Sequence, residues 1–385
     1  MPGFEVIGAE EQTEINDIFA RGGVLFRHGF DALRNDCYKV REFEAAFAAY
    51  MGVPHALAVT SGTAALRVAL AVLNLQPGDE VITQSFTFVA TAEAIIEARA
   101  VPVCCEVDAT LNMDPNDLER RITPRTKAVI AVHMLGTPAR LREISEICHR
   151  RNVVLLEDAA WGCGGSLDAR PLGTWGRMGT FSFDFAKTMT TGEGGMIVFG
   201  DRGDYELAAA WHDHGHENNP TVPRWEDTRS GSGFNYRMTE LQGAVGLAQL
   251  RKLDDVVRRQ RTNRDAIWRS IHDLPGVIAR AVPIGSVETA DALVFETSSP
   301  EVAREARNRL VAAGLSTKIL PEAVTWHFAG TWSHMPELVA HHGDLSIAFP
   351  ATARRLARCV SLPVVVNMDE AVPARVRTAI ESVLI

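Results

Sequence analysis

Residues 181–195 read Phe181-Ser-Phe-Asp-Phe-Ala-Lys187-Thr-Met-Thr-Thr-Gly192-Glu-Gly-Gly195, a lysine between an aromatic strand and a glycine-rich turn. A lysine in this position can form a Schiff base. Asp158 ends the apolar run Val153-Val-Leu-Leu-Glu-Asp158, where a carboxylate would be buried. Such an acid could keep a cofactor's ring nitrogen protonated, so the two residues together indicate a site for an electron-sink cofactor.

A short turn upstream has the features of a phosphate site. In Val59-Thr60-Ser61-Gly62-Thr63-Ala64-Ala65-Leu66, small and hydroxyl-bearing residues join a strand to a helix. Free backbone N–H groups and the positive end of the helix dipole face the same spot there, and Gly62 lets the backbone come close. Ser and Thr are also ordinary helix caps, so the turn alone leaves a purely structural role open. With Lys187 and Asp158, it indicates pyridoxal phosphate.

Between about residues 55 and 200, short apolar or β-branched runs alternate with helical stretches. This pattern predicts an α/β fold with a mostly parallel sheet of about seven strands and crossover helices. Apolar residues at helical spacing in 63–73 and 141–148 predict helices that cover the sheet. The predicted strands are 55–60, 80–83, 101–105, 128–132, 153–156, 179–183 and 195–199.

The rest of the chain predicts a smaller second domain. Residues 217–233 form a long polar loop, and loops of this length are usually functional or disordered. A helix is expected from residue 239 to 261. We therefore predict a large domain, residues 1–261, and a small C-terminal α+β domain, residues 262–385. The small domain should contain strands near 292–295 and 316–320 and a final helix at 371–385.

The composition argues against several classes of protein. The 385 residues carry a net charge of -9, which gives no general affinity for nucleic acid or anionic membranes. No apolar stretch reaches about 18 residues and no basic segment precedes an apolar one at the start, so we expect a cytoplasmic protein. The six cysteines are scattered, and the histidines of His212-Asp-His214-Gly-His216 lie in a loop. We expect no metal site.

The order of these motifs along the chain resembles a known family. A phosphate turn, the aromatic segment Ser85-Phe-Thr-Phe88, an acid at a strand end and a lysine after a further strand occur in the order of fold type I pyridoxal phosphate enzymes. Within them, the chain resembles the sugar aminotransferases named after DegT, DnrJ, EryC and StrS. The resemblance covers residues 40–260 and continues more faintly to Ser361-Leu-Pro363. It rests on the stretches 61–66, 78–82, 86–91, 123–128, 157–160, 181–187, 192–195 and 234–238.

The resemblance implies roles for the cofactor site. Lys187 would hold pyridoxal 5'-phosphate and later move a proton between the substrate carbon and the cofactor, while Asp158 would pair with the ring nitrogen. Phe88 would stack on the ring; if Phe88 is instead a core residue, this role passes to Phe86.

Further implied roles concern the phosphate and the assembly. Ser182 and the turn Ser61-Gly62-Thr63 would bind the phosphate, and Asn235 would reach it from the neighbouring subunit of a homodimer. After Glu157-Asp-Ala-Ala160 the family usually carries Gln or His, but this chain has Trp161. An indole donates one hydrogen bond and accepts none, so the contact to the phenolic oxygen and the shape of the substrate pocket are both in question.

The implied reaction is transfer of an amino group from L-glutamate to a sugar carbonyl. Most family members act on nucleotide-linked keto-sugars. The stretches 1–5, 34–36, 213–216 and 326–327 more narrowly resemble the branch that aminates a free octulosonate aldehyde, with His214, His216 and His327 near the sugar. Arg237 could bind a carboxylate of donor or acceptor.

Two other functions remain possible within the family. Sugar dehydratases carry histidine in place of the lysine, and their iron-sulfur versions need a cysteine cluster that this chain lacks. A non-catalytic regulatory protein would have no need for both Lys187 and Asp158. Residues 162–165 and 192–195 lack the spacing of a dinucleotide-binding turn. We therefore expect an aminotransferase.

Overall fold

The computed structural model describes residues 2–219, 221–229 and 231–384. At its centre lies a sheet in the order β1 (His55–Val59), β9 (Gly195–Phe199), β8 (Met178–Ser182), β5 (Val154–Asp158), β4 (Thr126–Val132), β2 (Glu80–Gln84) and β3 (Val101–Cys105). Neighbouring strands from β8 to β3 are parallel, whereas β9 is antiparallel to both β8 and β1. The predicted mostly parallel, seven-stranded sheet is confirmed.

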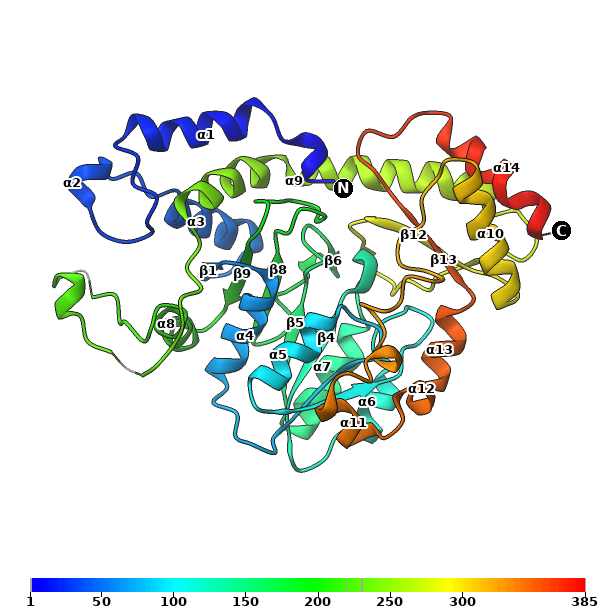
Figure 1. The fold of residues 1–385 in the computed structure, drawn as a ribbon, viewed down its shortest axis with the longest axis horizontal. Coiled ribbons are helices and arrows are strands. Elements are labelled where there is room, and N and C mark those ends of the chain that lie inside the picture. Colours follow the sequence, from blue (N-terminus) through cyan, green and yellow to red (C-terminus); the bar gives the residue numbers. More distant parts are fainter. Residues whose placement is uncertain (1, 220, 230, 385) are drawn as a thin grey trace.

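Helices cover this sheet (Figure 1). They are α3 (Lys39–Met51), α4 (Gly62–Val72), α5 (Val89–Glu97), α6 (Pro115–Arg121), α7 (Leu141–Arg151) and α8 (Arg202–Trp211). Two of them begin at the carboxyl ends of strands: α4 follows β1, and α5 follows β2. The Ser61 hydroxyl accepts a hydrogen bond from Ala64 N at 3.0 Å and so caps α4. The N-terminal helices are α1 (Ala9–Ala20) and α2 (Asp31–Arg34).

The long helix α9 (Glu240–Ile271) runs across the molecule to the C-terminal part (Figure 1). Thr239 and Gln242 form a capping box at its start. Gly243 allows close approach to α3, because a Cβ there would lie 2.6 Å from Val40 N. The predicted helix ended at residue 261, but α9 continues because Ile267 and Ile271 are buried in the C-terminal core. The predicted domain boundary thus falls inside α9, and the division into 1–261 and 262–385 stays a prediction.

The C-terminal part is an α+β unit. Its sheet has the order β10 (Ile278–Ala279), β12 (Ala292–Glu296) and β13 (Cys359–Pro363), all antiparallel. Its helices are α10 (Pro300–Ala312), α11 (Pro336–His342), α12 (Leu345–Ala348), α13 (Pro350–Leu356) and α14 (Val372–Leu384). A small sheet joins β11 (Ser286–Val287) from this part to β6 (Ser166–Leu167) and β7 (Arg170–Pro171).

One predicted strand is wrong. Residues 316–320 are irregular rather than extended. Ile319 has a φ of 73°, and Leu320 N donates back to Lys318 O at 2.9 Å, so the run turns instead of pairing along its length. Hydrogen bonds to Ser361, among them one from Lys318 N to Ser361 O at 2.8 Å, still tie it to β13.

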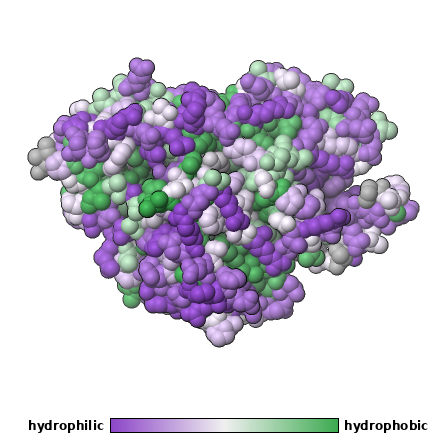
Figure 2. Space-filling model, turned by 180° about the vertical axis from the view of Figure 1, so that it is seen from behind, coloured by the Kyte–Doolittle hydropathy of each residue, from purple (hydrophilic) through white to green (hydrophobic). Residues whose placement is uncertain are grey.

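The surface seen from behind is largely hydrophilic with small hydrophobic patches (Figure 2). Residues 213–237, here called the arm, project from the large part beside α8 (Figure 1). Within the described residues, no helix has both the length and the apolar character needed to cross a membrane.

Candidate active site

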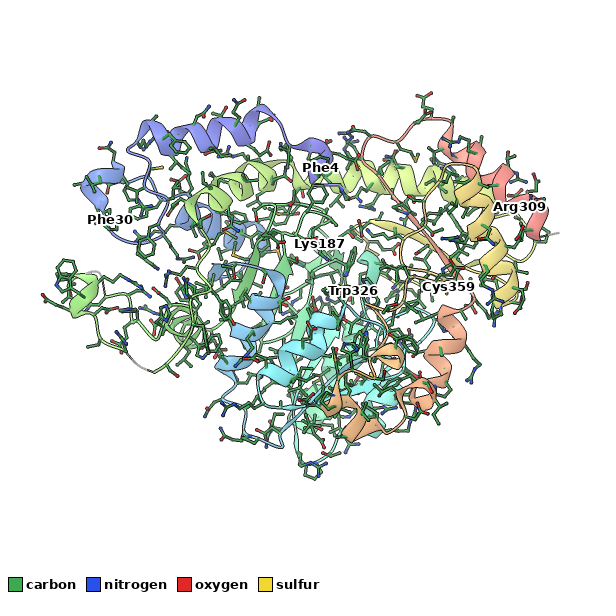
Figure 3. The ribbon with its side chains drawn as sticks, viewed as in Figure 1. Phe4, Phe30, Lys187, Arg309, Trp326 and Cys359 are labelled. Atoms are coloured by element: carbon green, nitrogen blue, oxygen red, sulfur yellow. The ribbon has the colours of Figure 1, made fainter. Side chains whose placement is uncertain are left out.

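A cavity of about 340 Å³ surrounds Lys187 at the carboxyl ends of the parallel strands. Its wall includes Ser61, Phe88, Asp158, Trp161 and Ser182, which come from four separate segments of the chain. Lys187 lies near the middle of the molecule, between the large part and the C-terminal part (Figure 3). The sequence-predicted lysine, acid, aromatic residue and phosphate turn therefore meet in one place.

Lys187 is held in a desolvated setting. Its Nζ lies 3.7 Å from the centroid of the Trp161 ring. Burial lowers the pKa of Lys187 to about 8, and the nearby Lys318 ammonium acts in the same direction, whereas Asp291 and Asp158 oppose it. A lysine with this pKa is partly neutral near neutral pH, as a nucleophile and a proton carrier both require.

Asp158, at the end of β5, is 5% exposed. Its carboxylate accepts hydrogen bonds from Thr91 Oγ1 at 2.9 Å and from Ala160 N at 3.1 Å. Burial raises the pKa of Asp158, while these two donors and the charge of Lys187 oppose the rise. One cavity wall therefore presents an oriented carboxylate, which suits a cationic ring N–H.

The turn at residues 61–63 lies against the end of β8. A Cβ on Gly62 would fall 2.7 Å from Ser182 Cβ, so glycine is required for this approach. The Ser61 oxygen accepts from the α4 backbone and leaves its O–H free to donate. Hydroxyl groups and the start of α4 therefore form an anion-binding corner in the same cavity.

An aromatic group forms another wall. Phe88 is 39% exposed and lies 6.2 Å from Trp326 and 5.4 Å from His327, measured between ring centroids. Backbone hydrogen bonds from Thr87 N to His327 O and from Val89 N to Trp326 O join the two segments. Phe86 is fully buried in the core. Of the two phenylalanines, Phe88 is therefore the one placed to contact a ring in the cavity.

His327 lines the cavity as well. Its Nδ1 is buried and has no hydrogen-bond partner among the described residues. Burial lowers the pKa of His327 to about 4, and the charge of Lys187 adds to the effect, so the imidazole is neutral near pH 7. The side chain can therefore offer a neutral hydrogen-bonding group to a ligand.

The other sequence-predicted residues lie elsewhere. His214, His216, Asn235 and Arg237 belong to the arm, and none of them is among the described residues that line the Lys187 cavity. Arg237 pairs with the buried Asp213 carboxylate, and His216 Nδ1 lies 3.2 Å from Asp227 Oδ2. Within one chain, these four residues therefore lie outside the described lining of the Lys187 cavity, and their roles stay predictions.

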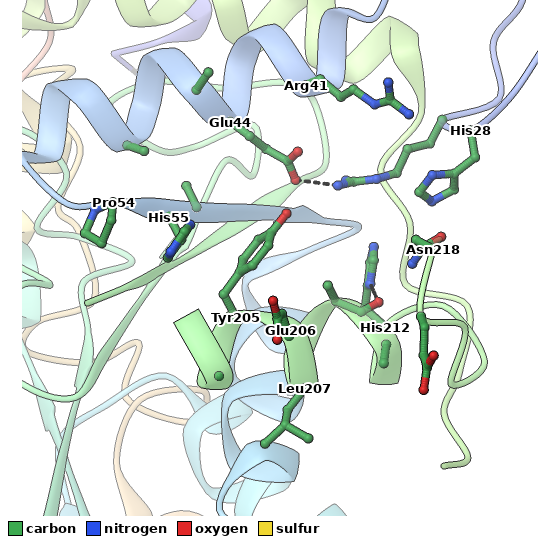
Figure 4. Close-up of a pocket in the computed structure, with 18 residues that line it drawn as sticks. His28, Arg41, Glu44, Pro54, His55, Tyr205, Glu206, Leu207, His212 and Asn218 are labelled. Carbon is green, nitrogen blue, oxygen red and sulfur yellow. Dashed lines mark hydrogen bonds and ion pairs between the residues drawn. The ribbon is translucent and has the colours of Figure 1, made fainter. Parts of the chain in front are cut away.

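A second cavity, of about 920 Å³, lies between α3, α8 and the arm. Figure 4 shows Glu44, His55 and Tyr205 in it, with the ion pair from Glu44 to Arg27, 2.6 Å long, as a dashed line. His55 and Tyr205 stack at 4.9 Å. None of the described residues that line it is a lysine, so the cavity around Lys187 is the candidate active site.

Three functional candidates were missed by the sequence analysis. Thr91 lies three residues after Phe88, inside the stretch 86–91 on which the resemblance rests, and this was an available signal. Asp291 and Lys318 come from the C-terminal part and reach the surroundings of Lys187 only through the fold. No motif marks them.

The fold and the cavity define a fold type I pyridoxal phosphate-dependent transferase. A crystal structure of the sugar aminotransferase CalS13 from Micromonospora echinospora superposes with a TM-score of 0.81 at 26% identity and covers 98% of both chains. The buried acid, the lysine and the glycine turn against Ser182 fit this cofactor, by their chemistry and their placement in one cavity.

Comparison of the sequence identifies the family. Residues 30–381 match the model of the DegT/DnrJ/EryC1/StrS aminotransferase family. A GDP-perosamine synthase of Caulobacter vibrioides is 43% identical over 56% of this chain and 57% of that protein. The dTDP-4-dehydro-2,3,6-trideoxy-D-glucose 4-aminotransferase of Saccharopolyspora spinosa is 33% identical over 81% of each. The chain belongs to this family and is a pyridoxal phosphate-dependent sugar aminotransferase.

Replacing Thr91 tests the setting of Asp158. Thr91→Val keeps the side-chain shape but removes a hydrogen bond to a buried carboxylate, a type of bond worth about 1.5–3 kcal/mol. We expect the dissociation constant for pyridoxal phosphate to rise at least about tenfold, measured by titrating apoprotein and following absorbance. The exposed Thr262→Val in α9 is the matched control. Equal affinity in both variants would contradict a role for Thr91.

Proposed function

We propose that the enzyme transfers an amino group from L-glutamate to a carbonyl carbon of a sugar. The observation that carries this proposal is the shared cavity of Lys187 and Asp158, since a lysine with a lowered pKa beside a buried acid suits amino transfer. The bound cofactor supplies an electron sink for negative charge at the substrate carbon. Lys187 Nζ would take the proton from that substrate carbon and pass it to the cofactor carbon that bears the transferred nitrogen.

The remaining cavity residues bind and orient the cofactor in this proposal. Asp158 keeps a proton on the ring nitrogen, and Phe88 contacts the ring face. Ser61, Gly62 and Thr63 of the turn bind the phosphate at the start of α4, together with Ser182. Trp161 closes the cavity beside Lys187 and limits water there.

Two acceptor classes are supported by different observations. The relatives named GDP-perosamine synthase and dTDP-4-dehydro-2,3,6-trideoxy-D-glucose 4-aminotransferase favour a nucleotide-linked keto-sugar. The narrower resemblance at residues 1–5, 34–36, 213–216 and 326–327 favours an octulosonate aldehyde, with His327 at the cavity wall close to the sugar.

The donor half of the reaction can be followed by absorbance. In cofactor-loaded enzyme, addition of L-glutamate should make the long-wavelength absorbance band disappear, with release of one 2-oxoglutarate per site. Lys187→Ala should not show this change. The converted enzyme, mixed separately with a nucleotide-linked keto-sugar and an octulosonate aldehyde, should regain the band with only the true acceptor class. No conversion by L-glutamate would contradict the proposed donor.

We also propose a homodimer in which the arm of each subunit completes the cavity of the other. Three observations support it: Asn235, Arg237, His214 and His216 do not line the cavity of their own chain; Trp225 in the arm is 84% exposed; and Phe234 is also exposed. Exposed aromatic residues on a projecting segment are typical of a surface that binds another protein.

Light scattering tests the assembly. The wild-type protein should have twice the chain mass of 42.0 kDa. Trp225→Glu should shift the equilibrium toward the monomer, because a charge replaces an apolar contact. Ile284→Glu, at a position 88% exposed in the C-terminal part, should not. A wild-type monomer, or an equal effect of both variants, would contradict the arrangement.

A further inference from the structure

A second lysine lies beside the first. Lys318 Nζ is 4.5 Å from the centroid of the Trp161 ring, and Lys187 Nζ is 3.7 Å from the same centroid. The two ammonium nitrogens are therefore no more than 8.2 Å apart, the sum of these distances. Trp161 belongs to the cavity wall, whereas Lys318 and Asp291 are not among the described residues that line it, and Lys318 reaches its edge only through the contact of its ammonium with Trp161. The indole that replaces the family's usual Gln or His thus contacts a cation from each part of the molecule.

Lys318 has a fixed carboxylate partner. Its Nζ lies 2.5 Å from Asp291 Oδ2. Asp291 is only 2% exposed, and its other oxygen, Oδ1, has no hydrogen-bond partner among the described residues. A buried carboxylate that served only structure would ordinarily have both oxygens satisfied. This half-satisfied pair therefore indicates a place where a ligand is expected.

Hydrogen bonds of its backbone fix the position of Lys318. Its N–H donates to Ser361 O of β13 at 2.8 Å, and its carbonyl oxygen accepts from the Ser361 hydroxyl. The turn at Ile319, which takes the place of the predicted strand, follows directly after Lys318.

The ammonium group has donors to spare. An ammonium carries three N–H donors, and among the described residues only Asp291 accepts from Lys318. Its side chain is 18% exposed, so it is not sealed in the core. A cation with unused donors, held beside the reactive lysine, suits a carboxylate, and charge-assisted hydrogen bonds of this kind are strong.

We propose that Lys318 binds a carboxylate of the substrates, with Trp161 as the surface on which it and Lys187 are held. This inference rests on the proposed aminotransferase function and deepens it. The carboxylate comes from the amino-acid donor or from an acidic sugar acceptor. Asp291 orients Lys318 through their ion pair.

Binding of a carboxylate that cannot react tests the proposal directly. Glutarate, titrated into cofactor-loaded enzyme and followed by cofactor absorbance and tryptophan fluorescence, should bind saturably to the wild type. Lys318→Met should weaken this binding at least about tenfold, because the ammonium donors are lost. Lys318→Arg should bind within about threefold of the wild type, since it keeps a charged donor. Lys127→Met, at an exposed site on β4, is the matched control and should bind as the wild type does.

The source of the carboxylate follows from the same variants. With Lys318→Met, equal loss of apparent affinity for L-glutamate and L-glutamine assigns the α-carboxylate. A loss for L-glutamate alone assigns its side-chain carboxylate. A loss for an octulosonate aldehyde, with neither amino acid affected, assigns the acceptor.

The inference and the proposed function fail in different ways. Glutarate binding that depends on Lys318, in an enzyme that L-glutamate does not convert, would keep the carboxylate site and overturn only the donor. Normal conversion by L-glutamate together with equal glutarate affinity in the wild type and Lys318→Met would overturn the inference. Absence of glutarate binding by the wild type would overturn it as well.

Discussion

The burial of Lys187 against the indole of Trp161 is the interaction on which the rest of the site depends. Removal from water destabilises the charged form of a lysine, and this burial lowers the pKa of Lys187 to about 8. Two carboxylates, Asp158 and Asp291, partly restore the charged form, while Lys318 opposes it. Opposite charges are thus balanced around one amine, and this balance suits a group that must both bond to a carbonyl and carry a proton.

The sheet makes this balance possible. Parallel strands end at the same edge of a sheet, so Asp158 on β5 and Ser182 on β8 lie near each other. The turn after β1 lies at the same edge, because β9 pairs with both β1 and β8. These residues lie far apart in the sequence but have a common place in the fold. The C-terminal part contributes Asp291 and Lys318 to the charges around Lys187, so both parts of the chain shape its pKa.

Much of this could be predicted from the sequence because the signals are local. Each of the seven strands is a short apolar run with clear ends, and the sheet they form was predicted for that reason. Lys187, Asp158 and the turn at Gly62 could be found because strand-end chemistry appears in the sequence next to its strand. Phe88 rather than Phe86 lines the cavity, a distinction that depends on how the segment packs against Trp326 and His327.

The rest depends on contacts between distant residues. The strand predicted at 316–320 has a suitable composition, but Ile319 adopts a positive φ and the run turns. Asp291 and Lys318 lie in ordinary stretches, and only tertiary packing brings them to Trp161. The arm residues Asn235 and Arg237 show a different limit, because neither is among the described residues that line the Lys187 cavity of its own chain. Local sequence patterns therefore identify the site residues that lie next to the strands of the large part. They do not identify Asp291 and Lys318, which reach Lys187 only through tertiary packing.

The most direct test of this account is the position of the cofactor's covalent bond. Cofactor-loaded enzyme can be reduced with borohydride, digested and analysed by mass spectrometry. The account predicts that the pyridoxyl label lies on the peptide that contains Lys187, at one label per chain, with Lys318 unmodified. A label on Lys318, or no stable label on Lys187 in saturated enzyme, would contradict it.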